Sequence, residues 1–253
     1  MDAVAVAGDV GAGFLQGRGA TGAQGEVGAG GGELQRDGAA DAATAAGDEN
    51  ALAGEIEFVF GLWAIVLILA MVAMTGGAQA LGGIDVLVNN ASGFGMGDDE
   101  AGWAAGLSVD VMAMVRSSRA ALPWLQRSGA AGGASIVHIS SIAAFRPSTR
   151  TPAYAAVKAA MNSYTGSQAA LLSRQGIRVN AIAPGSIEFP GGVWDQRKTD
   201  NPTLYERTLK SIPFGRFGTA DEVAEVALFL ASPHARWVTG QVLGVDGGQL
   251  LGA

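Results

Sequence analysis

The chain of 253 residues contains no cysteine, which excludes a disulfide scaffold, a thiolate nucleophile and a zinc site built from cysteines. It has only two histidines, His138 and His234, far apart in the sequence, so we expect no metal site. Charged residues make up only 15% of the chain, and no basic stripe with interleaved aromatic residues occurs. We therefore expect no binding of nucleic acid. The apolar fraction of 49% is sufficient for a hydrophobic core.

The first segment, residues 1–55, differs from the rest of the chain in charge and composition. It holds nine acidic and two basic side chains, so its net charge of −7 equals that of the whole protein. Glycine and alanine together supply 29 of its residues, and no apolar period of 3.6 or 2 residues is sustained. Its one strand-like piece, Val-Ala-Val at 4–6, is too short to predict a strand. We expect this segment to be weakly structured.

The second segment, residues 56–80, contains seventeen consecutive uncharged residues at 58–74, most of them apolar. This run is slightly short for a transmembrane helix, which needs about 20 residues, and no basic cluster flanks it to set an orientation. It begins too late in the chain for a secretory signal peptide and lacks the basic start of one. We expect a buried strand and helix here, with a membrane anchor as the alternative.

The third segment, residues 81–253, alternates strands and helices. Short apolar runs, typical of strands buried on both faces, occur at 84–88, 135–140, 178–184 and 242–245. Helical stretches lie at 103–126, 153–173 and 219–231. The last of these begins with Thr219 and Glu222, the two members of a capping box. Strands that alternate with helices of this length predict a parallel α/β sheet with helices on both faces.

Polar residues follow three of these strands at the carboxyl ends, where parallel sheets bind their ligands: Asn89, Ser141 and Ser186. In the helix at 153–173, Tyr154 and Lys158 are four residues apart and lie on the same face. A phenol is a poor acid or base at neutral pH, but a nearby ammonium favours the phenolate and makes proton transfer feasible. A serine hydroxyl could hold the reacting oxygen within reach of the phenol. The pattern indicates acid/base chemistry at a substrate oxygen.

Five motifs occur in order along this segment: GGIDVLVNNAS (82–92), SIVHISSIAA (135–144), YAAVK (154–158), RVNAIAPGSI (178–187) and WVTGQVLGVDGG (237–248). In these motifs, and in the spacing of thirteen positions from Ser141 to Tyr154, the segment resembles the short-chain dehydrogenase/reductase family, in particular its 3-oxoacyl-ACP-reductase-like members. The resemblance implies a Rossmann-like, doubly wound parallel sheet. It also implies an oxidoreductase that uses NAD or NADP on a small-molecule carbonyl or alcohol, works in the cytoplasm and forms homo-oligomers.

The resemblance further implies a role for each matching residue. Tyr154 is the acid/base that protonates the carbonyl oxygen or deprotonates the alcohol, and Ser141 holds that oxygen. Lys158 favours the ionised form of Tyr154 and hydrogen-bonds the nicotinamide ribose. Asn89 lies beside the same ribose, and the backbone of Ile187 contacts the nicotinamide carboxamide. The segment 188–215 matches the variable substrate lid, which does not identify the substrate.

Two departures from the family pattern stand out. Asp110 occupies the position of an asparagine whose backbone carbonyl helps to hold a water of the proton relay, and its carboxylate would add a negative charge near Lys158. The family also opens with a strand and a Thr-Gly-x3-Gly-x-Gly loop that holds the pyrophosphate. Here residues 21–28 come close, but Glu26 replaces the middle glycine, and a carboxylate there would repel a phosphate. No residue can be placed that would choose between NAD and NADP.

Three interpretations follow from this contrast. The first is an active NAD(P)-dependent oxidoreductase in which residues 1–55 are a degenerate first half of the Rossmann unit. The second is a catalytically silent remnant whose first 75 or so residues come from an altered reading frame, which translation of the other two frames of the parent DNA would test. The third is a membrane-anchored protein with its anchor at 58–74.

Overall fold

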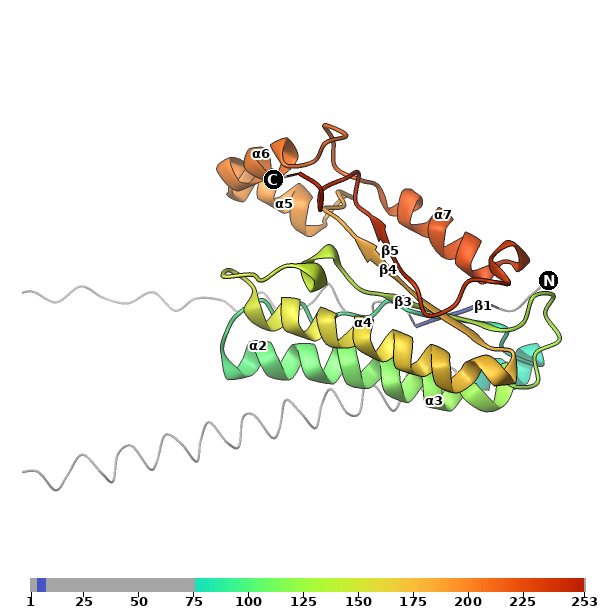
Figure 1. The fold of residues 1–253 in the computed structure, drawn as a ribbon. Helices are drawn as coiled ribbons and strands as arrows, with labels where there is room; N and C mark the ends of the chain where they lie inside the picture. The colour runs from blue at the N-terminus through green and yellow to red at the C-terminus, as the bar shows by residue number, and fades with distance from the viewer. Residues whose placement is uncertain (1–3, 8–75, 253) are drawn as a thin grey trace, which may run out of the picture.

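The computed structural model describes residues 4–7 and 76–252, and these form a parallel sheet covered by helices on both faces (Figure 1). The sheet has the order β1-β2-β3-β4-β5, and every neighbouring pair of strands is parallel. The strands are β1 (Val4–Ala7), β2 (Val86–Asn89), β3 (Ser135–Ile139), β4 (Arg178–Pro184) and β5 (Val242–Val245). This arrangement confirms the expected Rossmann-like α/β architecture.

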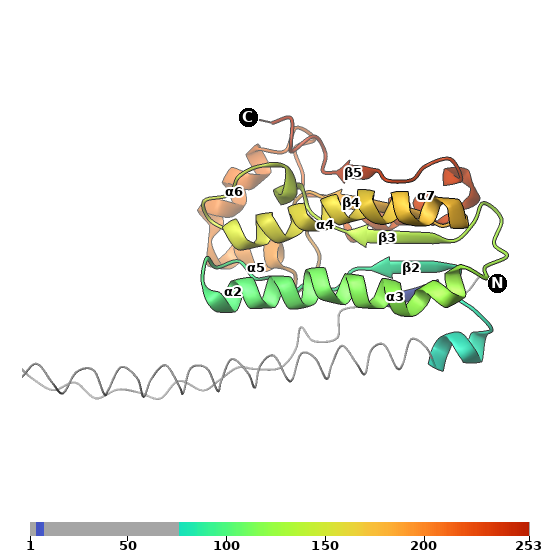
Figure 2. The same cartoon turned by 60° about the horizontal axis from the view of Figure 1, so that its bottom comes forward.

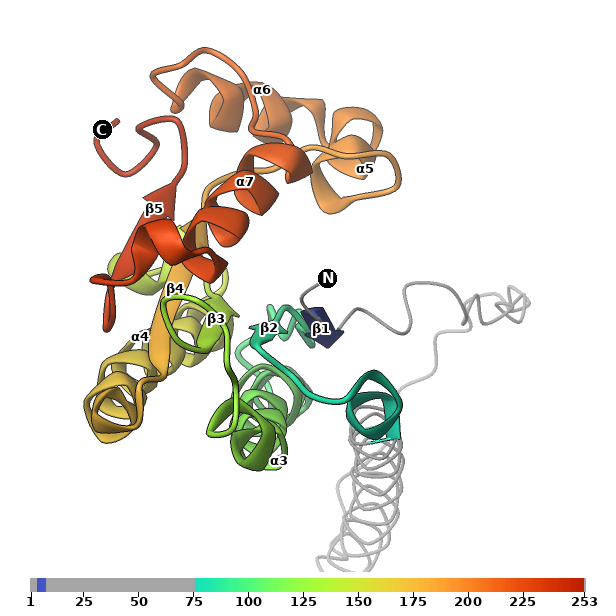
Figure 3. The same cartoon turned by 90° about the vertical axis from the view of Figure 1, so that its right-hand side faces the viewer.

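Helices lie on opposite faces of the sheet: α3 and α4 cover one face and α7 the other (Figure 3). The α-helices are α2 (Glu100–Ala105), α3 (Met114–Leu125), α4 (Pro152–Leu172), α5 (Val193–Asp200), α6 (Pro202–Lys210) and α7 (Ala220–Ala231). The π-helix η1 (Gly106–Ala113) joins α2 to α3. Short 3-10 helices are η2 (Ile142–Phe145), η3 (Ser173–Gln175) and η4 (Pro233–Ala235).

The strand at the start of the chain corrects one expectation. Residues 4–6 looked too short to predict a strand, but Val4–Ala7 forms β1 and pairs along its whole length with Val86–Asn89 of β2. A four-residue strand carries little signal of its own, and what stabilises it is its pairing with a neighbour more than eighty positions away. The apolar run at 58–74 and the glycine-rich stretch at 21–28 lie outside the described residues. Among those described, no helix is both long enough and apolar enough to cross a membrane.

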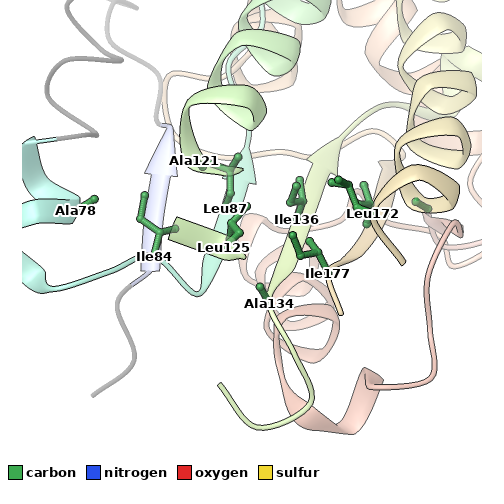
Figure 4. Packing of buried hydrophobic residues seen from close by; sticks show 11 residues of the cluster. Ala78, Ile84, Leu87, Ala121, Leu125, Ala134, Ile136, Leu172 and Ile177 are labelled. Atoms are coloured by element: carbon green, nitrogen blue, oxygen red, sulfur yellow. The ribbon is translucent and has the colours of Figure 1, made fainter. Parts of the chain in front are cut away.

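The core between the sheet and α3 and α4 consists of aliphatic side chains, as the strand patterns predicted. Leu87 of β2 and Ile136 of β3 are fully buried and face Ala121 and Leu125 of α3 (Figure 4). Removing such side chains from water supplies most of the free energy that holds helices on a sheet. The sheet is therefore a rigid support for the residues at its carboxyl edge.

The predicted helix at 103–126 is present, but its middle is a π-helix. The wider turns of η1 pack tightly on α4: a Cβ added at Gly106 would lie only 3.0 Å from a methyl carbon of Val157. In Figure 2, α2 and α3 form one rod beside α4. π-helical turns are rare and often occur at functional sites, and here the turn carries Asp110.

The helix α7 begins as predicted. Thr219 accepts a hydrogen bond from the backbone of Glu222, and the Glu222 carboxylate accepts one from the backbone of Thr219. Its other end is held by Arg178 at the start of β4, whose guanidinium donates to the carbonyls of Leu230 and Ser232 at 2.6 and 3.3 Å. A cation at the carboxyl end of a helix also complements the helix dipole.

Candidate functional site

The carboxyl ends of β2, β3 and β4 meet at one edge of the sheet. Asn89 pairs in register with His138, and His138 with Ala181, so the residues that follow each strand are neighbours in space. The amino-terminal half of α4 passes this same edge (Figure 2). Parallel α/β sheets bind ligands at such an edge.

Asn89 lies inside the molecule rather than open at the edge. Its side chain is 5% exposed. The amide oxygen accepts a hydrogen bond from Ser117 at 2.5 Å, and the amide nitrogen donates to His138 Nδ1 at 3.0 Å. Both groups of the amide are thus occupied by the protein itself. The predicted contact with a ribose stays a prediction, and on this geometry it would have to involve the backbone of Asn89.

His138 links three elements through its ring. Nδ1 accepts from Asn89 of β2, so Nε2 carries the proton and donates to Gln168 of α4 at 2.9 Å. Burial lowers the pKa of His138 to about 4, so the ring is neutral near pH 7. His138 has no role predicted from the sequence, although a histidine in an apolar strand must find polar partners when buried.

The low pKa of His138 predicts that the protein loses stability in mild acid. Between its ordinary value of 6.5 and about 4 the unfolded chain binds a proton that the folded chain does not, so the free energy of unfolding falls as pH falls. The loss should be about 3 kcal/mol in total. Urea denaturation across this range would measure it, and His138→Gln should flatten the slope. The exposed His234 supplies the control, since His234→Gln should leave the slope unchanged. Equal slopes for all three proteins would contradict the prediction.

Tyr154 and Lys158 are brought together on α4, as their spacing predicted. The ammonium nitrogen of Lys158 lies 5.5 Å from the centre of the Tyr154 ring. Lys158 is 2% exposed and donates to the carbonyl of Ile139 on β3 at 3.1 Å, whereas Tyr154 is half-buried. The helix begins with Pro152, which suits a first helical turn because it lacks an N–H.

The buried ammonium is paired with a carboxylate from the π-helix. Lys158 Nζ lies 2.8 Å from Oδ1 of Asp110, and the two side chains are 3% and 1% exposed. The same carboxylate accepts hydrogen bonds from the Ser92 hydroxyl and the Gly93 N–H, each at 2.8 Å. Asp110 thus joins the loop after β2 to α4. The negative charge near Lys158 was expected from the sequence, whereas the hydrogen bonds with Ser92 and Gly93 were not.

Ser141 follows β3 and caps the short helix η2, which packs on α4. Its oxygen accepts a hydrogen bond from the Ala143 N–H at 3.2 Å, so its hydroxyl proton is available to another acceptor. Within the described residues, no hydrogen bond joins Ser141 to Tyr154. The adjacent Ser140 donates to the backbone carbonyl of Lys158 at 3.3 Å, which ties the end of β3 to α4.

Ile187 has a backbone conformation that leaves its own peptide groups available. It forms a parallel bridge with Gly218, in which the Gly218 N–H donates to Ser186 and the Glu188 N–H donates to Gly218. In such a bridge the N–H and C=O of the central residue point the other way. No other described residue hydrogen-bonds to them. Ile187 therefore offers one donor and one acceptor side by side.

The turn before Ile187 is held by the end of the chain. The amide oxygen of Gln249 accepts from the Ser186 N–H at 2.9 Å, and the amide nitrogen donates to the Ser186 hydroxyl at 3.0 Å. Gly185 lies so close to Asp246 that a Cβ would come within 2.8 Å of its backbone Cα. These contacts fix the position of the Ile187 peptide.

The segment predicted to be a lid forms α5 and α6. Trp194 and Tyr205 both pack against Phe217, with ring centres 5.2 and 4.7 Å apart, while Phe189 is 49% exposed. The Tyr205 hydroxyl also donates to Glu188 at 2.9 Å. Trp194 and Tyr205 thus belong to one aromatic cluster around Phe217. No cluster of metal ligands occurs within residues 4–7 and 76–252.

The sequence of the chain is similar to those of known oxidoreductases. Residues 70–249 match a family model described as enoyl-(acyl carrier protein) reductase. The chain is 42% identical over 177 residues to isoepoxydon dehydrogenase patN of Aspergillus clavatus, which covers 69% of this chain and 67% of that protein. It is 38% identical over 182 residues to the 3-oxoacyl-(acyl-carrier-protein) reductase FabG of Thermotoga maritima, covering 68% of this chain and 69% of the relative.

A solved structure shares both sequence and fold with the chain. It is a 7α-hydroxysteroid dehydrogenase complexed with NADH and 7-oxo glycochenodeoxycholic acid. The match has a TM-score of 0.64 and 32% identity, and it covers 71% of this chain and 69% of the other.

Proposed function

Because the chain belongs to the short-chain dehydrogenase/reductase family, we propose that it is an NAD- or NADP-dependent oxidoreductase that interconverts a small-molecule carbonyl compound and an alcohol. The observation that carries the proposal is the buried Lys158 ammonium held beside the Tyr154 ring at the carboxyl edge of the sheet. An ammonium costs much free energy to bury, and its place next to a phenol supports an acid/base role for that phenol.

The described residues fit the nicotinamide half of such a cofactor. A carboxamide presents one acceptor and donors side by side, which complements the available C=O and N–H of Ile187. Lys158 has three N–H donors. Two of them are directed at Asp110 and the carbonyl of Ile139, so one remains for a ribose hydroxyl. When bound, the nicotinamide would accept or supply the hydride.

The protein's own part in the reaction is proton transfer at the substrate oxygen. Tyr154 donates its phenol proton to the oxygen of the carbonyl as that oxygen gains negative charge, and takes a proton from the alcohol in the reverse direction. The ammonium of Lys158 attracts the phenolate that is left, and the carboxylate of Asp110 weakens that attraction. Ser141 donates its hydroxyl proton in a hydrogen bond to the same oxygen, which keeps that oxygen close to Tyr154.

We also propose that the protein forms homo-oligomers and works in the cytoplasm. The exposed apolar side chains of α7 and its surroundings support self-association: Leu228 is 67%, Phe229 42% and Trp237 97% exposed. Neighbouring apolar groups on a surface often mark an interface. The substrate is a carbonyl compound or alcohol. Because the relatives are named for substrates as different as isoepoxydon and 3-oxoacyl groups, a broad panel of candidate substrates should be screened.

A fluorescence titration of the full chain with NADH and NADPH tests this proposal first. Saturable binding of either cofactor is expected, and it should be followed by a screen of 3-oxoacyl, steroid, sugar and simple ketone substrates. A folded protein that shows no saturation at millimolar concentrations of both cofactors would overturn the proposal. The chain would then be a silent member of its family.

A further inference from the structure

The carboxylate of Asp110 partly offsets the only positive charge buried beside Tyr154 within the described residues. Asp110 and Lys158 are almost completely enclosed, and their charged atoms are 2.8 Å apart. Together they present no net charge to the phenol. An ammonium facing Tyr154 alone would stabilise the phenolate much more strongly, because water does not screen charges at buried positions.

Other charged groups near α4 do not alter this balance. Of the elements that pack on α4, η2 has no titratable residue, and His138 of β3 is neutral near pH 7. Glu100 of α2 and Arg174 of η3 are exposed, and so are Arg146 and Arg150 in the loop between η2 and α4. Arg178 of β4 is at the far end of its strand. The charge that Tyr154 experiences is therefore set chiefly by Asp110 and Lys158.

We propose that Asp110 is a positioning residue that sets the pH range in which Tyr154 exchanges its proton. The carboxylate holds Lys158 in place and offsets its charge, so that Tyr154 keeps its proton to a higher pH than an unpaired ammonium would allow. A site of this kind favours the protonated phenol, the form that donates a proton when a carbonyl is reduced. The inference rests on the proposed function, but its main test requires neither cofactor nor substrate.

The test follows the ionisation of Tyr154 by the near-ultraviolet absorbance of tyrosinate. The chain has three tyrosines, Tyr154, Tyr164 and Tyr205, so the difference between each protein and its Tyr154→Phe counterpart isolates one phenol. Asp110→Asn keeps the size of the side chain and an acceptor but removes the charge. We expect the titration midpoint of Tyr154 to move down by about one pH unit, a tenfold rise in the phenolate fraction at a fixed pH.

Three further variants separate charge from structure. Asp110→Glu keeps the charge and should leave the midpoint near that of the wild type. Asp221→Asn makes the same chemical change on the exposed face of α7 and should have no effect. The double variant Lys158→Met/Asp110→Asn has no unpaired buried charge, so it should fold even where Asp110→Asn does not. Its midpoint should stay within about half a pH unit of the wild type, because the net charge beside the phenol is again zero.

Two outcomes would overturn the inference. One is an unchanged midpoint in a folded Asp110→Asn protein. The other is a rise of more than about one pH unit in the double variant, which would mean that Lys158 acts on Tyr154 without being offset. If cofactor titration finds binding and a substrate is known, the rising limb of kcat/KM for alcohol oxidation should move to lower pH in Asp110→Asn by the same amount. If the wild-type chain binds no cofactor, the proposed function is contradicted, but the effect of Asp110 on the ionisation of Tyr154 can still be measured by absorbance.

Discussion

Replacing Tyr154 by Phe should lower the turnover of any substrate found for this chain by about 10²–10⁴-fold, the range by which general acid/base groups accelerate reactions. The substitution removes only the phenol oxygen. The ring that Lys158 approaches at 5.5 Å remains, and Tyr154 is only half-buried, so little packing is lost. The comparison to make is kcat for carbonyl reduction by the two proteins at the same pH.

Tyr164 supplies a matched control for this prediction. It lies on the same helix and is also half-buried, but its position ten residues further on takes it away from the carboxyl edge. Tyr164→Phe should keep nearly full turnover, and both variants should retain the affinity of the wild type for NADH or NADPH. A Tyr154→Phe protein with more than about a tenth of the wild-type kcat would show that another group transfers the proton.

The sequence predicted the sheet and the Tyr154–Lys158 pair because both depend on local periodicity. Buried parallel strands are continuous apolar runs, and a spacing of four residues places two side chains on one face of a helix whatever surrounds it. The capping box of Thr219 and Glu222 is equally local, and it is present. The family motifs added the order of these elements along the chain.

The contacts that the sequence could not predict are those between elements distant in the chain. Asp110 was expected near Lys158, but its hydrogen bonds with Ser92 and Gly93, 18 and 17 positions away, were not. Nothing in the local pattern distinguishes the π-helical turn of η1 from the α-helix around it. The ring of His138 is satisfied by Asn89 and Gln168, 49 and 30 positions away. The strand β1 exists through its pairing with β2. In each case tertiary structure decides the outcome, not propensity.

The pair of Lys158 and Asp110 also makes the site depend on the stability of the fold. Lys158 joins α4 to β3 through the carbonyl of Ile139, and Asp110 joins η1 to the loop after β2 through Gly93. The ammonium that acts on Tyr154 is thus fixed by elements from both sides of the site. Its loss would change the catalytic group and the packing around it together.

A double-mutant cycle on this pair should give the largest change in stability. Lys158→Met leaves the carboxylate of Asp110 buried and unpaired, and Asp110→Asn does the same to the ammonium of Lys158, so each single change should cost about 3–5 kcal/mol of the free energy of unfolding. The double variant should be more stable than either single variant, because it has no buried charge to desolvate. Urea denaturation near neutral pH measures all four proteins.

The ion pair of Lys198 and Glu188, which is open to water, is the control for this cycle. The coupling energy of Lys158 and Asp110 should exceed that of this pair. Its charged atoms are 3.3 Å apart and its side chains are 60% and 26% exposed, so Lys198→Met and Glu188→Gln should reveal a coupling energy far smaller than that of the buried pair. The two pairs have similar geometry and differ mainly in their access to water. A coupling energy at Lys158 and Asp110 as small as that at the exposed pair would mean that water reaches the buried pair in solution. Asp110 could then neither fix Lys158 nor offset its charge beside Tyr154.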